Sequence, residues 1–192
     1  MPLESLVALS LAGGFFSFVV VSVILTRLHL VTTLPPTRPL SPTRFIGVAL
    51  AFLPMALLEE FLFRWVLIGQ LDRWIGLVPA FLLSIVAFAA VHRPNGKLGF
   101  VAVLNLAIVG AILGVVYLHW GLWVVTAAHA GWNLAQWGLG YAVSGQKTRA
   151  LLPSPIIREV KDEPFGPEGH WSATVVMLVA LAILVASHSA HL

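Results

Sequence analysis

Two adjacent glutamates, Glu59 and Glu60, stand in an apolar stretch of a chain in which only 10% of the residues are charged. Ionisable side chains at membrane depth are costly, and those that occur usually face a protein interior and mark a functional site. Arg64 follows Glu60 by four residues, so on a helix these two side chains share a face and can form an ion pair. Glu59 is rotated by about 100° from that face, which leaves its carboxylate to meet another group.

Two histidines and an asparagine add further polar groups to the apolar stretches. His92 ends one stretch, while His129 and Asn133 lie four residues apart and so share a helical face. Both side chains of this second pair can donate hydrogen bonds, which suits them to hold a developing negative oxygen. A single intramembrane histidine or asparagine is often only a contact between helices. The recurrence of such groups in three apolar stretches favours a polar site.

Six apolar stretches supply the elements that must position these groups, and each approaches the ~20 residues that a membrane-spanning helix needs. They are residues 5–27, 45–70, 77–92, 98–118, 121–142 and 171–188. With 59% hydrophobic residues, the chain of 192 residues predicts an all-α, polytopic integral membrane bundle of about six transmembrane helices. We expect one membrane domain, 1–192. Its core helices are 45–142, followed by a polar cytoplasmic loop, 143–170, and an appended helix, 171–188.

The second and third stretches predict an antiparallel hairpin that turns near Ile75. Glu59 lies 16 residues before Ile75, and His92 lies 17 residues after it. At ~1.5 Å of rise per residue, the two side chains reach nearly the same depth. A carboxylate and an imidazole can therefore meet across this hairpin.

Basic residues predict the orientation of the bundle. If successive helices cross the membrane in alternating directions, nine of the 11 Lys and Arg residues lie on one face of the membrane and Arg73 lies on the other. Arg64 lies within a helix. The positive-inside rule makes the first face cytoplasmic and both termini extracytoplasmic, as in a prokaryotic inner membrane. The nine are Arg27, Arg38, Arg44, Arg93, Lys97, Lys147, Arg149, Arg158 and Lys161. Charge dispersed in this way indicates topology and no nucleic-acid binding, and the absence of cysteine excludes Cys-ligated metal.

The polar groups resemble the motifs of the CPBP family of glutamic intramembrane proteases, which includes CAAX prenyl proteases and bacteriocin-processing, Abi-type membrane proteins. The motifs Glu-Glu-x-x-x-Arg, Phe-x-x-x-His and His-x-x-x-Asn occur in order, as Glu59-Glu60 with Arg64, Phe88 with His92, and His129 with Asn133. The resemblance covers roughly Leu57 to Asn133. Trp65 departs from the small residue that many relatives carry after the motif arginine, which bears on local packing.

The resemblance implies an intramembrane endopeptidase that cleaves a membrane-anchored, prenylated or otherwise lipidated protein, or a peptide, without a cofactor. Glu59 and His92 would activate the water, and His129 and Asn133 would form the oxyanion hole. Glu60 and Arg64 would fix the geometry of the site. Spacing by itself leaves Glu60 open as the base.

Other functions are compatible with the same side chains. Glu59, His92 and His129 match a common catalytic zinc shell, although the sequence lacks a His-Glu-x-x-His motif. Buried carboxylates and histidines also line proton and ion paths in transport proteins. His92 and His129 could hold a haem between them, and a non-catalytic membrane scaffold could retain the motifs.

Overall fold

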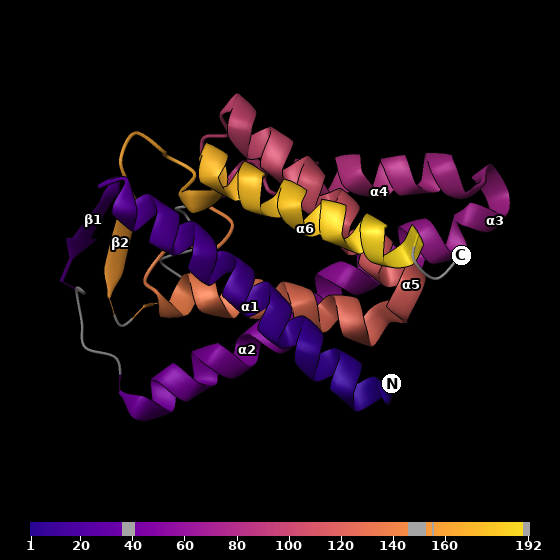
Figure 1. Ribbon diagram of the computed structural model, residues 1–192, viewed down its shortest axis with the longest axis horizontal. Coiled ribbons are helices and arrows are strands. Elements are labelled where there is room, and N and C mark those ends of the chain that lie inside the picture. Colours follow the sequence, from indigo (N-terminus) through magenta and orange to yellow (C-terminus); the bar gives the residue numbers. More distant parts are fainter. Residues whose placement is uncertain (36–40, 146–152, 155, 190–192) are drawn as a thin grey trace.

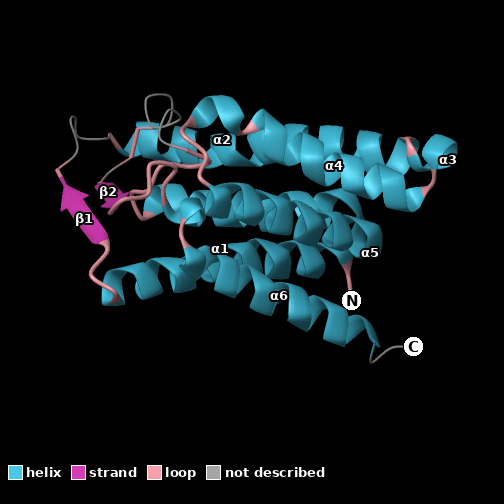
Figure 2. Cartoon of the chain, turned by 90° about the horizontal axis from the view of Figure 1, so that it is seen from above, coloured by secondary structure: helices cyan, strands magenta, loops and turns pink. Residues whose placement is uncertain are grey.

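The helices of this protein are stacked in three layers. The computed structural model describes residues 1–35, 41–145, 153–154 and 156–189. Figure 1 shows the elements along the chain, and Figure 2 shows the layers from above. The layers are α5 (Phe100–Gly138) in the middle, α1 (Leu3–Arg27) and α6 (Trp171–Ser189) on one side, and α2 (Pro42–Glu60) with α4 (Leu77–Val91) on the other. The predicted all-α membrane bundle is confirmed.

Several helices in the described residues are long and apolar enough to cross a membrane. By length and composition they are Leu3–Arg27, Pro42–Ile75, Leu77–Asn95 and Phe100–Gly138, and α6 adds a shorter apolar helix. α5 accounts for two predicted stretches, because its backbone breaks at Gly121 (φ 79°, ψ −175°). Glycine adopts this left-handed φ without a steric penalty. The chain turns back there (Figure 1), so about six membrane crossings agree with the structure.

The second predicted stretch is α2 continued by a π-helix, η1 (Phe61–Gln70). Ser41 caps α2, since its hydroxyl accepts a hydrogen bond from the Arg44 backbone N–H at 3.3 Å. A short helix, α3 (Asp72–Ile75), then makes the turn to α4 where the hairpin was expected. π-Helical turns are rare in proteins, but those that occur are often found at functional sites. This one begins directly after Glu59 and Glu60.

A short strand in the loop after α1 pairs with a short strand in the loop before α6, which the sequence did not predict. β1 (Val31–Leu34) pairs antiparallel with β2 (Ile157–Val160), with Val31 opposite Val160. Each strand has four residues, and its partner is far away in the sequence. An alternation pattern of that length is too short to identify a strand.

The loop before α6 was expected to be polar, but its last part is buried. Residues 165–169 are all buried, and they include the 3-10 turn η4 (Pro167–Gly169). η4 contacts α5, α6 and α1. This part of the loop therefore belongs to the protein interior.

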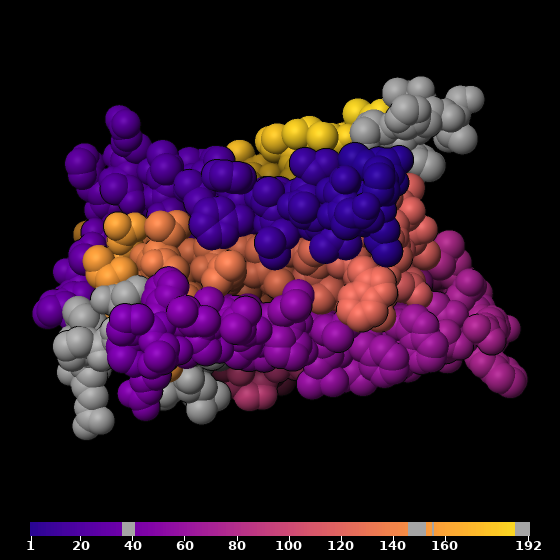
Figure 3. Space-filling model, turned by 90° about the horizontal axis from the view of Figure 1, so that it is seen from below, coloured from indigo at the N-terminus to yellow at the C-terminus, as the bar shows by residue number. Residues whose placement is uncertain are grey.

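α1 packs closely along α5, as Figure 3 shows for the indigo and orange helices. The approach depends on glycine in both helices. A Cβ atom on Gly14 would collide with the Ala128 carbonyl oxygen, and one on Gly131 would collide with the Leu11 carbonyl oxygen. α1 thus lies against the part of α5 that carries His129.

Candidate active site

Glu60 and Arg64 form the buried ion pair that their spacing predicts. Arg64 Nε lies 3.1 Å from Glu60 Oε2, and neither side chain is exposed. The Arg64 guanidinium lies over the Phe88 ring, 4.6 Å from its centre, and donates a hydrogen bond to the Gly110 carbonyl at 3.3 Å. Burying a charge is costly unless it is paired and hydrogen-bonded. Arg64 is paired with Glu60 and hydrogen-bonded through Nη2, and these contacts connect η1 to α2, α4 and α5.

The other oxygen of Glu60 binds His129, a contact that the sequence did not reveal. His129 Nδ1 donates a hydrogen bond to Glu60 Oε1 at 2.7 Å. The donor is the imidazole because an ionised carboxylate only accepts. This bond leaves Nε2 of His129 facing Glu59. Glu60 therefore orients His129 as well as pairing with Arg64.

Glu59 lies between the two histidines. Its Oε2 is 4.0 Å from Nε2 of His92 and 4.0 Å from Nε2 of His129. These distances exceed those of direct hydrogen bonds, and they accommodate a bridging water. Oε2 is buried and has no hydrogen-bond partner among the described residues, although 32% of the Glu59 side chain is exposed. The hairpin thus brings Glu59 and His92 together, as their equal depth predicts.

The His92 ring is oriented by its own helix. His92 Nδ1 lies 2.7 Å from the Phe88 carbonyl, so this nitrogen is the donor. In a neutral imidazole with that tautomer, Nε2 is an acceptor, and Nε2 is the nitrogen that faces Glu59. Glu59 and His92 present two acceptors to the space between them, which is the arrangement that orients a water molecule.

Asn133 and both histidines border a cavity. Asn133 lies one turn after His129 on α5 and is buried. With His92 and His129 it lines a cavity of about 530 Å³ among α1, α4, α5 and α6. Most of the other lining residues are apolar, among them Leu9, Ile112 and Met177. Ligand sites commonly have this character, with a few polar groups in an otherwise apolar pocket.

Trp65, which departs from the family motif, lies away from the polar side chains described above. It is 40% exposed, and its ring stacks on Phe61 at 4.9 Å between ring centres. The large side chain therefore does not crowd the polar groups.

The structure brings the predicted side chains together. Five form one network of close approaches, Glu59, Glu60, Arg64, His92 and His129, and Asn133 shares the cavity. The zinc alternative fits less well, because the 4.0 Å separations exceed the roughly 3.4 Å between ligands about 2.1 Å from one tetrahedral zinc. Within the described ranges, no three His, Asp or Glu side chains are grouped so that they could hold a metal ion.

The cavity also contains a carboxyl group that the sequence did not reveal. Glu168, on η4, is 6% exposed and lines the cavity with the two histidines. In the sequence it stands in Gly166-Pro167-Glu168-Gly169, which is typical of a turn, and turns usually lie at the surface. No spacing relates it to the three motifs.

Residues 39–135 match the family model described as Type II CAAX prenyl endopeptidase Rce1-like. No curated protein matches the chain, and no solved structure does. The matched segment spans half of the chain and contains Glu59, His92, His129 and Asn133, whereas α1, Glu168 and α6 lie outside it. The chain therefore belongs to the Rce1-like family of type II CAAX prenyl endopeptidases, which are CPBP membrane proteases.

Proposed function

We propose that this protein is a glutamate-dependent intramembrane endopeptidase that hydrolyses a peptide bond in a prenylated or otherwise lipid-anchored protein. The main support is the position of Glu59 Oε2, 4.0 Å from Nε2 of both His92 and His129. The family supports peptide hydrolysis as the reaction and prenylated membrane-associated proteins as the substrate class.

In this proposal Glu59 and His92 hold and deprotonate the water. A water between them donates one hydrogen bond to Glu59 Oε2 and the other to His92 Nε2, which leaves an oxygen lone pair for the substrate carbonyl. The water oxygen bonds to the carbonyl carbon while Glu59 takes the proton. General base catalysis by a positioned side chain contributes ~100- to 10,000-fold.

His129 and Asn133 donate hydrogen bonds to the resulting oxyanion. Because His129 Nδ1 already donates to Glu60, Nε2 can donate only when the imidazole carries both protons. The carboxylates of Glu59 and Glu60 lie on either side of this ring and balance its positive charge. Arg64 and Glu60 keep the ring in place.

The cavity beside these groups would hold the apolar chain of the substrate. Its volume of about 530 Å³ is in the ~300 to 1,000 Å³ range of small-molecule sites. α1 and α6 supply apolar side chains, including Leu6, Leu9, Val176 and Met177. An anchored substrate could thus keep its lipid in an apolar environment while its peptide bond reaches His129 and Asn133.

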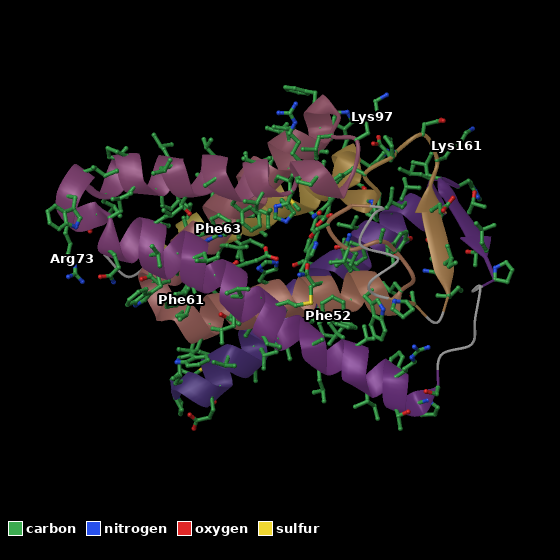
Figure 4. The ribbon with its side chains drawn as sticks, turned by 180° about the vertical axis from the view of Figure 1, so that it is seen from behind. Phe52, Phe61, Phe63, Arg73, Lys97 and Lys161 are labelled. Atoms are coloured by element: carbon green, nitrogen blue, oxygen red, sulfur yellow. The ribbon has the colours of Figure 1, made fainter. Side chains whose placement is uncertain are left out.

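The charge distribution supports a cytoplasmic assignment for the end of the bundle that carries the strands. Lys97 and Lys161 lie toward that end, and Arg73 lies at the opposite end (Figure 4). α1 begins and α6 ends at the Arg73 end (Figure 1). By the positive-inside rule, both termini are then extracytoplasmic in a prokaryotic inner membrane. Arg38, Lys147 and Arg149, which contribute to this prediction, lie outside the described residues.

Cleavage of a library of membrane-anchored, farnesylated peptides by detergent-purified protein tests the proposal. We expect wild type and Glu4→Gln, a charge-loss control at the exposed start of α1, to cleave equally. Glu59→Gln should lose at least ~100-fold in turnover. Equal cleavage by Glu59→Gln would overturn the role of Glu59. Absence of cleavage together with Glu59-dependent ion flux in liposomes would support transport instead.

A chelator separates the glutamate mechanism from the zinc alternative. We expect activity to persist after treatment with a strong chelator. Activity lost on chelation and restored by zinc would assign Glu59, His92 and His129 to a metal site.

A further inference from the structure

Glu168 is a buried carboxyl group that the proposed mechanism does not use. It lies outside the segment matched by the family, on a loop that carries none of the three motifs. Its side chain nevertheless lines the same cavity as His92, His129 and Asn133. It is 6% exposed, and no ion pair links it to a cation within the described residues. A buried acid without an ion pair requires an explanation.

The hydrogen-bonding neighbours of Glu168 leave one of its oxygens without a partner. Trp132 Nε1 donates to Oε1 at 3.4 Å, while Oε2 is buried and has no partner in the described part of the chain. The Gln136 side chain also hydrogen-bonds to this carboxyl group, and its Nε2 donates to the Ala142 carbonyl at 2.7 Å. Gln136 Oε1 is also buried and has no partner among these residues. The buried Oε2 without a partner and the lack of an ion pair among the described residues both disfavour the carboxylate, because a buried charge is costly unless it is paired and hydrogen-bonded.

The backbone around Glu168 is held firmly in place. Asn105 Nδ2 donates to the Glu168 carbonyl at 2.8 Å and to the His170 carbonyl at 3.2 Å. Asn105 Oδ1 in turn accepts a hydrogen bond from the Thr174 hydroxyl at 2.6 Å. One buried side chain on α5 thereby fixes η4 and the start of α6, so the carboxyl group is kept at the cavity wall.

The charges that face Glu168 do not outweigh its burial. Burial raises the pKa of the Glu168 carboxyl above its ordinary value, although His92, Gln136, Trp132 and His129 act in the opposite direction. Of these neighbours the titratable groups are His92 from α4 and His129 from α5. The described side chains that α1 and α6 contribute to the cavity are uncharged. The Glu168 carboxyl therefore keeps its proton to a higher pH than a free carboxyl group does.

We propose that Glu168 is the general acid that protonates the leaving amine during hydrolysis, an assignment that rests on the proposed function. Glu59 takes a proton from the attacking water, and the water oxygen bonds to the carbonyl carbon. When the tetrahedral intermediate collapses, the C–N bond breaks and the amine nitrogen takes the proton of Glu168. The products are a carboxylic acid and an amine. Transfer of the proton from Glu59 to Glu168 through water restores the starting state.

The surroundings of the two carboxyl groups suit this division of roles. The Glu59 side chain is 32% exposed and its Oε2 lies 4.0 Å from Nε2 of two histidines, whereas Glu168 is 6% exposed and forms no ion pair in the described part of the chain. Paired catalytic carboxyl groups take the roles of base and acid when their environments favour opposite protonation states. Glu59, which is more exposed, is thus suited to act as the base. Glu168, which is buried, is suited to act as the acid.

A comparison of two leaving groups tests the assignment. One substrate is a farnesylated peptide cleaved by the wild type, and the other has a thioester in place of the scissile amide. A thiolate leaves near neutral pH without a proton, whereas an amine requires one. Glu168→Gln should therefore lose ~100- to 10,000-fold in turnover of the amide, with little change in KM. It should cleave the thioester at nearly the wild-type rate, which also demonstrates that the variant is folded.

Two controls make the result decisive. Glu163→Gln removes a carboxyl group from the same loop but outside the cavity lining, and it should cleave both substrates normally. Glu59→Gln should lose both activities, because both substrates require an activated water. Loss of both activities in Glu168→Gln, or retention of both, would overturn the assignment of the acid. A wild type that cleaves neither substrate would overturn the proposed function itself.

Discussion

His129 on α5 donates a 2.7 Å hydrogen bond from Nδ1 to Glu60 at the end of α2, although 69 residues separate them in the sequence. The same carboxylate pairs with Arg64 at 3.1 Å. Glu60 therefore links the element that carries Glu59 to the helix that carries Asn133. The spacing of Glu60 from Arg64 predicts only the ion pair, but Glu60 also orients His129. The geometry of the candidate site therefore depends on both contacts of this one side chain.

Glu60→Gln should destabilise the protein because it leaves the Arg64 guanidinium buried without its counter-charge. Removing one partner of a buried pair costs about 3 to 5 kcal/mol, and thermal unfolding in detergent measures the loss. The double variant Glu60→Gln with Arg64→Met removes both charges, so it should be more stable than Glu60→Gln alone. Costs that simply add in the double variant would contradict the pairing.

Asn133→Ala should lower turnover without impairing folding. Loss of one oxyanion donor typically costs ~100- to 1,000-fold in kcat, and KM should change little because the interaction forms in the transition state. Steady-state cleavage of the farnesylated peptide measures both constants. Gln70→Ala, which removes an amide at the far end of η1, serves as the control. A change confined to KM would assign Asn133 to substrate binding.

Glu168 should make the stability of the protein depend on pH. Since burial raises the pKa of this carboxyl, the native state keeps the proton at pH values where the unfolded chain has lost it. The stability that this proton contributes is complete below the unfolded pKa and decreases as the pH rises through the raised folded pKa. Glu168→Gln is neutral throughout, so its melting temperature should exceed that of wild type by an amount that grows with pH. Glu4→Gln is the charge-loss control, and a gap independent of pH would refute the neutral carboxyl.

The crossing of α1 and α5 should tolerate a methyl group at one glycine but not at its neighbour. Gly13 has nothing within 4 Å of an added Cβ, whereas a Cβ on Gly14 would collide with the Ala128 carbonyl. Gly14→Ala should therefore cost about 1 to 3 kcal/mol through overpacking. Gly13→Ala should be neutral or stabilising by up to about 1 kcal/mol because alanine favours the helix. Unfolding midpoints of the two variants provide the comparison, and equal values would exclude a tight crossing.

The sequence predicts those contacts that depend only on distance along a helix or hairpin. Four-residue spacing predicts the Glu60–Arg64 pair, and equal depth on either side of Ile75 predicts that Glu59 meets His92. Both relationships follow from helix geometry without knowledge of the remaining chain. The six apolar stretches likewise follow from length and composition.

The contacts that the sequence did not predict depend on how distant elements are rotated and docked. The bond from His129 to Glu60 requires the rotation of α5 about its axis relative to α2, which no local pattern specifies. Glu168 enters the cavity because Asn105 and Thr174 hold its turn, a contact between segments far apart in the chain. The turn-forming sequence around Glu168 predicts that its side chain is exposed, but tertiary packing buries it.

The pairing of β1 with β2 has a consequence for the order in which the protein assembles. β1 follows α1, but its partner β2 precedes α6. Contacts between residues so distant in the chain form late, because closing the long intervening segment costs entropy before any bond compensates for it. The β1–β2 ladder, the turn that carries Glu168 and the part of the cavity wall that α6 supplies can therefore form only after the segment from β2 through α6 has been synthesised. On the proposed mechanism, Glu59, His129 and Asn133 would thus be in the membrane before Glu168 is in place, and we expect the nascent protein to be inactive until α6 docks.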